Sequence, residues 1–160
     1  MIAKLQRLRA EVAFDRAALE RRAQELAGLE LGPSAEAAVC AQAAVALHHA
    51  YGSVESILLR VARQIDGDVP GGGEWHQELL HGMGLAVEGI RPAVLSRESV
   101  AALRELLSFR HFFRHAYAVE LEADRLSVLR GRLQAALPRL LAELGELDRL
   151  LADVAARGDA

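Results

Sequence analysis

The sequence predicts an all-α protein with about five helices, folded as a single domain over residues 1–160. Apolar residues make up 52% of the chain and aromatic residues only 4%, and leucine and alanine recur at helical spacing between charged residues. Glycine and proline gather at a few joints, which separate long helical stretches. A chain of this length is long enough to bury a core as one domain.

The first two helices are predicted over residues 2–29 and 35–65. A Gly-Pro pair at 32–33 ends the first helix, and Ser34 is expected to cap the second. In the first helix, apolar residues follow one stripe and charges lie opposite; the stripe consists of Ile2, Leu5, Leu8, Val12, Leu19 and Leu26.

A glycine-rich connector, residues 66–73, precedes a short third helix over residues 74–83. Its triple glycine lacks the following Gly-Lys-Ser/Thr of a phosphate-binding loop. His76, Glu78 and His81 raise the alternative of a metal site. Two histidines five residues apart diverge by about 140° on a helix, which disfavours shared ligation, so we predict neither a metal nor a cofactor.

The last two helices are predicted over residues 97–117 and from residue 123 or 124 to 156. Ser96, together with Ser99, offers a cap for the fourth helix. Pro138 is expected to kink or restart the fifth helix. An apolar seam along that helix, which includes Leu133, Leu137 and Leu140, suits packing within the chain or dimerisation, and packing within the chain is the default expectation.

Side chains suited to phosphate binding and proton transfer gather near the end of the predicted fourth helix. On a helix, Arg114 lies about 40° from Arg110, and His111 about 100° from it. His115 lies about 140° from Arg110, and Tyr117 returns to within about 20° of it. Arginine can hold a phosphate bidentately and histidine can transfer protons near neutral pH, so this strip suits cleavage of RNA by its own 2′-hydroxyl.

The alternative for this strip is structural, because histidines and arginines on amphipathic helices are commonly solvated or paired. However, Arg110, His115 and Tyr117 form an R-x4-H-x-Y pattern. This pattern resembles the signature of the HEPN superfamily in its HepT-like toxin branch. His111 follows the arginine, where that superfamily usually carries a polar residue.

The resemblance extends beyond the motif. Residues 51–58 and 75–80 precede it in the same order as similar segments of that family, so the resemblance covers roughly residues 40 to 135. It implies a HEPN-like, up-down helical bundle that works as a homodimer. It also implies a metal-independent endoribonuclease that acts as the toxin of a toxin–antitoxin system.

The resemblance further implies roles for individual residues. Arg110 would hold the scissile phosphate, and His115 would activate the 2′-hydroxyl or protonate the leaving oxygen. His111 would assist this reaction or position the RNA. Tyr51 and Glu55 would lie near the active groove, although a structural role in bonding a neighbouring helix is equally open for both.

The partner implied by the resemblance is a nucleotidyltransferase antitoxin of the MNT type. In that family the antitoxin can transfer AMP to the motif tyrosine, which here is Tyr117. An alternative within the same superfamily is a non-catalytic HEPN subunit that binds substrate for a nucleotidyltransferase. A helical scaffold with no chemistry of its own is a third possibility.

The charge of the chain bears on RNA binding. The formal net charge is −3, so no global field attracts nucleic acid. The local cations Arg104, Arg110 and Arg114 would have to bind RNA, and a dimer would double them. Cys40, the single cysteine, is expected to be a core residue. With no secretory signal and no apolar run near the ~20 residues of a membrane span, the sequence predicts a cytoplasmic protein.

Overall fold

The computed structural model describes residues 1–115 and 121–157, and this part of the chain is all-α. The helices are α1 (Ile2–Ala27), α2 (Ala37–Val61), α3 (Trp75–Met83), α4 (Arg97–His115) and α5 (Ala123–Arg157). A single π-helical turn, η1 (Ala62–Asp66), extends α2. The predicted fold class and the predicted number of helices are confirmed.

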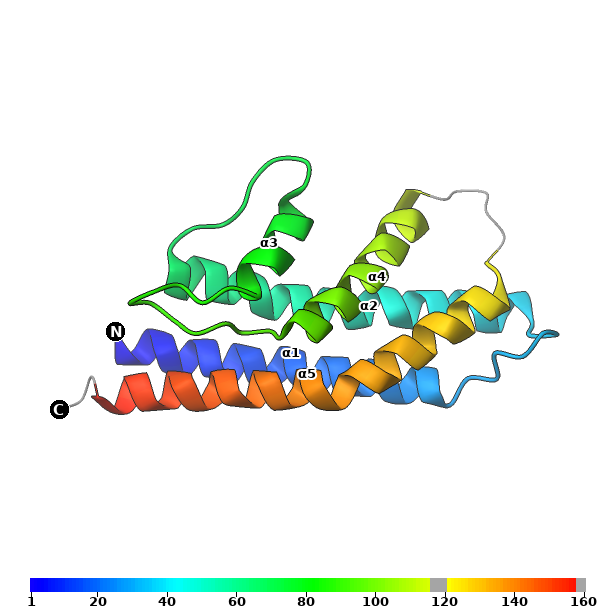
Figure 1. Ribbon diagram of the computed structural model, residues 1–160. Helices are drawn as coiled ribbons and strands as arrows, with labels where there is room; N and C mark the ends of the chain where they lie inside the picture. Colours follow the sequence, from blue (N-terminus) through cyan, green and yellow to red (C-terminus); the bar gives the residue numbers. More distant parts are fainter. Residues whose placement is uncertain (116–120, 158–160) are drawn as a thin grey trace.

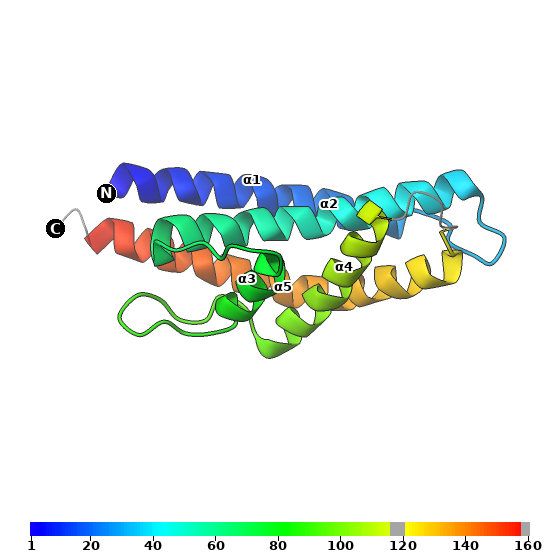
Figure 2. The same ribbon diagram turned by 90° about the horizontal axis from the view of Figure 1, so that it is seen from above.

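Three long helices form the body of the bundle, and two shorter ones lie on one side of it. Figures 1 and 2 show α1, α2 and α5 running alongside one another, with the start of α1 and the end of α5 at the same end of the bundle. Helices α3 and α4 lie together on the side of α2, and α4 also contacts α5. None of the helices in the described residues is long and apolar enough to cross a membrane.

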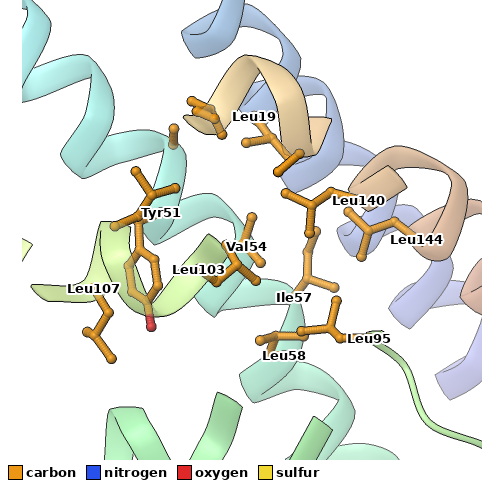
Figure 3. Packing of buried hydrophobic residues seen from close by; sticks show 14 of the residues in the cluster. Leu19, Tyr51, Val54, Ile57, Leu58, Leu95, Leu103, Leu107, Leu140 and Leu144 are labelled. Carbon is orange, nitrogen blue, oxygen red and sulfur yellow. The ribbon is translucent and has the colours of Figure 1, made fainter. Parts of the chain in front are cut away.

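The core lies where α1, α2, α4 and α5 meet. Figure 3 shows side chains from all four helices converging there, and burying each leucine contributes about 1.5–3 kcal/mol to folding. One acidic residue lies on the buried stripe of α1: Asp15 accepts a hydrogen bond from Arg60 Nε of α2 at 3.0 Å. The labelled residues in Figure 3 are Leu19, Tyr51, Val54, Ile57, Leu58, Leu95, Leu103, Leu107, Leu140 and Leu144.

The predicted caps fared differently at the two helix starts. The prediction for Ser34 is wrong, because α2 begins at Ala37, and the preceding turn is closed by a hydrogen bond from Ala35 N–H to Gly32 O at 3.0 Å. The prediction for Ser96 is confirmed, since its Oγ accepts the N–H of Ser99 at 3.2 Å.

Helix α5 runs without interruption through Pro138. Proline removes the hydrogen bond to the residue four positions earlier and clashes with its carbonyl, and Figure 1 shows α5 changing direction in this part. The predicted kink is therefore confirmed, and the predicted restart is not. The buried seam passes through Ala136, whereas Leu137 is only half-buried, so the sequence-based seam was displaced by one residue here.

A buried arginine fixes the connection between α3 and α4. The Arg91 side chain is only 2% exposed and donates to both carboxylate oxygens of Asp66, at 2.6 and 2.8 Å. It also donates to the carbonyls of Leu85, Pro92 and Gly82, at 2.9–3.3 Å. These bonds tie the segment after α3 to the end of η1 and so set the position from which α4 starts.

Candidate active site between α2, α3 and α4

A pocket of about 350 Å³ opens between α3 and α4. On α4 it is lined by Arg104, Ser108 and His111, which follow one another at helical spacing of four and three residues. Leu107 forms the apolar part of this wall. The opposite wall comes from the start of α3 and the residues before it: Gly73, Glu74, His76 and Gln77.

Glu55 of α2 contacts one residue of α3 and one residue of α4. The carboxylate is buried, and its two oxygens contact different partners. His76 Nδ1 of α3 lies 2.5 Å from Oε2, and Arg110 Nη2 of α4 lies 3.5 Å from Oε1. Three helices therefore meet at a single carboxylate.

The Arg110 side chain is largely buried but only weakly paired. Its side chain is 15% exposed, and the 3.5 Å contact with Glu55 is too long for a strong hydrogen bond. Its Nε is buried and has no hydrogen-bond partner among the residues that the structure describes. The guanidinium carbon lies 5.7 Å from the centre of the Tyr51 ring, at cation–π distance. Arg110 thus keeps donor capacity for an anionic ligand.

The ring of Tyr51 on α2 packs against the Arg110 guanidinium. This ring is buried beside Leu107 (Figure 3), and burial followed by the charge of Glu55 raises the pKa of Tyr51. The phenol therefore stays protonated. These contacts give Tyr51 a supporting position.

His48 lies one turn before Tyr51 on α2, beside the aromatic side of α4. Its ring centre is 5.8 Å from that of Phe113. Burial lowers the pKa of His48, and the positive charge of Arg110 lowers it further. The other phenylalanines anchor α4 to α5, because the Arg125 guanidinium of α5 lies 4.5 Å from the Phe112 ring centre and 5.9 Å from that of Phe109.

The remaining predicted site residues lie along α4 or beyond its end. Arg104 and Arg114 are exposed on α4, and Arg104 lines the pocket with His111. His115 is the last residue of α4. Tyr117, the predicted modification site, lies outside the described residues.

Two of the predicted residues lie next to Arg110 in the interior of the site, together with one residue that the sequence did not assign to it. Tyr51 and Glu55, which the resemblance places near the active groove, both lie against Arg110. His76 was considered only as a metal ligand in the sequence, yet it bonds to Glu55 and lines the pocket. Its signal was its place in residues 75–80, one of the segments that resemble the HepT-like family.

The metal alternative for α3 has no support in the geometry. Glu78 and His81 are exposed, while His76 turns toward Glu55. Within the part of the chain that the structure describes, no group of three or more His, Cys, Asp or Glu side chains gathers closely enough to hold a metal ion.

Comparison with known proteins identifies the family. A family model described as HepT-like protein matches residues 42–151, which is more than half of the chain. The matched segment includes every site residue named above. Searches of curated proteins and of solved structures found no match. On its family match and its all-α bundle, the chain belongs to the HepT-like proteins of the HEPN superfamily.

Proposed function

We propose that this protein is the toxin of a toxin–antitoxin pair and acts as a metal-independent endoribonuclease. The observation that carries the proposal is the largely buried Arg110 guanidinium, whose Nε–H has no partner among the described residues and which shares the Glu55 carboxylate with His76 of the pocket wall. A guanidinium with unused donors, away from bulk water, can hold a phosphate and stabilise charge that develops on its oxygens. Membership of the HepT-like family supports a ribonuclease-related role.

In the proposed reaction, the ribose 2′-oxygen bonds to the adjacent phosphorus while the bond to the 5′-oxygen breaks. The products are a 2′,3′-cyclic phosphate and a 5′-hydroxyl. Arg110 holds the phosphate, and His115 transfers a proton. His111, in the pocket wall, positions the RNA or assists. Arg104 and Arg114 bind neighbouring phosphates.

Glu55 and Tyr51 support Arg110 in this proposal. The Glu55 carboxylate holds the guanidinium in place without saturating it. The Tyr51 ring lies at cation–π distance from the same group, which adds to its positioning. Neither residue needs to touch the RNA for this role.

The proposed assembly is a homodimer whose two sites share an RNA-binding cleft, which would concentrate positive charge that this chain of net charge −3 otherwise lacks. The proposed partner is a cytoplasmic MNT-type nucleotidyltransferase antitoxin that transfers AMP to Tyr117. Tyr117 lies seven residues after Arg110, so an adenylate there would compete with RNA for Arg110 through its negative charge. Intact mass after incubation with the antitoxin and ATP, compared with Tyr117→Phe, tests this step.

The function itself is tested by cleavage of single-stranded RNA by the purified protein in the presence of EDTA. The wild type should release fragments with cyclic phosphate ends, and Arg110→Ala and His115→Ala should not, with helical circular dichroism and oligomer mass unchanged. Binding of RNA without cleavage by the wild type would instead identify a substrate-binding subunit. Inhibition by EDTA would contradict the metal-independent mechanism.

A further inference from the structure

We infer that His76 is the general base of this site, oriented by Glu55 and acting on the RNA 2′-hydroxyl. The inference rests on the proposed ribonuclease function and adds a catalytic residue that lies outside the R-x4-H-x-Y motif. His76 belongs to α3, 34 residues before Arg110 in the sequence, and reaches the site only through the fold.

The imidazole of His76 is held on two sides. Its Nδ1 lies 2.5 Å from Glu55 Oε2, a short hydrogen-bond distance. The Trp75 ring stacks on it with centres 3.6 Å apart and planes 28° apart. When Nδ1 carries the proton, Nε2 of a neutral imidazole has a lone pair and can accept one.

The position of His76 matches that of a base acting on RNA held by Arg110. The two residues contact the two oxygens of the same Glu55 carboxylate, so a phosphate bound to Arg110 would lie close to the imidazole. His76 is 22% exposed and lines the pocket opposite His111 and Arg104. The imidazole is therefore anchored from behind and open toward the space that RNA would occupy.

The proton balance requires two groups. His76 Nε2 takes the proton of the 2′-hydroxyl as the oxygen–phosphorus bond forms. A second group, the motif residue His115, gives a proton to the 5′-oxygen as its bond to phosphorus breaks. Glu55 stabilises the imidazolium that forms on His76, and so serves as a positioning residue.

The charges around His76 come from α2, α4 and the segment before α3. Glu55 of α2 and Glu74, the residue before α3, are acidic, whereas Arg104 and Arg110 of α4 are basic, and His111 faces His76 across the pocket. Charges of both signs surround the imidazole. The pH profile of the reaction therefore has to be measured in variants of His76 itself.

The deciding variant is His76→Asn, because the asparagine amide can still donate to Glu55 from the place of Nδ1 but offers no base. Cleavage by His76→Asn should fall about 100-fold or more, and the acidic limb of its kcat/KM profile should disappear. His81→Asn, an exposed histidine on the same helix, is the matched control and should cleave like the wild type. Thermal unfolding of both variants checks that α3 stays folded.

A substrate with a 5′-bridging sulfur at the cleaved bond separates base from acid, because its leaving group departs without a proton. This substrate should restore cleavage by His115→Ala and leave His76→Asn slow. Near-wild-type cleavage by His76→Asn, or its rescue by the sulfur substrate, would overturn the inference while leaving the ribonuclease assignment intact. If the wild-type protein cleaved no RNA, both the role of His76 and the ribonuclease assignment would be wrong.

Discussion

Arg91 and Arg110 are two arginines of this molecule in opposite situations. Arg91 donates to both oxygens of Asp66 and to three backbone carbonyls. Arg110 has a single 3.5 Å contact with a carboxylate that it shares with His76, and its Nε has no partner among the described residues. The bonds of Arg91 hold the segment after α3 against the end of η1, whereas Arg110 keeps donors that a ligand can use. The number of acceptors around a buried guanidinium thus separates a structural role from a binding role.

Replacing each arginine by methionine compares the two sites directly, because methionine keeps an apolar stem and removes the charge. Arg91→Met should lower the free energy of unfolding by about 3–5 kcal/mol, since Asp66 and three carbonyls lose their donor. Urea denaturation measures the effect. Arg149→Met, at an exposed position, is the control and should change stability by about 0.5 kcal/mol or less. If Arg91→Met lowered the free energy of unfolding no more than Arg149→Met, the structural role of Arg91 would be contradicted.

The same substitution at the second site should act on activity instead. Arg110→Met should change the free energy of unfolding by less than about 1 kcal/mol, because a single long ion pair is lost. RNA cleavage should fall by about 10²–10³-fold, the usual cost of losing one donor to a developing oxyanion. Unfolding and cleavage are measured on the same preparation. If Arg110→Met unfolded as readily as Arg91→Met, the distinction between the two arginines would fail.

The contrast between the two arginines also marks what the sequence alone could predict. The helical spacing placed Arg110, His111 and His115 in one sector of α4, because that geometry is local. It could not show that Arg110 turns back toward Glu55, since this depends on how closely α2 approaches α4. Likewise His76 reaches Glu55 through the packing of α3 against α2, which no local pattern shows.

The errors in helix details have a similar origin. Ser34 is a favourable cap residue, yet the turn closed at Gly32 places the start of α2 further along the chain. In α5, leucine is the more apolar residue at 137, but the neighbouring alanine at 136 faces the core. Local preference predicts which stretches are helical, and tertiary packing then decides which residue caps or fills a given position.

A smaller effect is expected at His48, whose pKa is lowered by burial and by the charge of Arg110. Because the folded state binds this proton less readily than the unfolded state, stability should fall as the pH drops below the ordinary histidine pKa of about 6.5. His48→Gln should flatten this part of the stability profile between about pH 6.5 and 5, and the exposed His49→Gln should not. In Arg110→Met the decline near pH 6 should weaken. An unchanged profile in His48→Gln would show that another group is responsible.

The most direct test of the central claim follows the Nε–H signals of the two arginines by NMR, while RNA carrying a 2′-O-methyl group at the cleavage site is added. The account predicts that the Arg110 signal, identified by its loss in Arg110→Met, shifts and saturates as its free donor engages a phosphate. The Arg91 signal should stay in place throughout. An Arg110 signal that does not move at saturating RNA would contradict the assignment of this arginine as the phosphate-binding group.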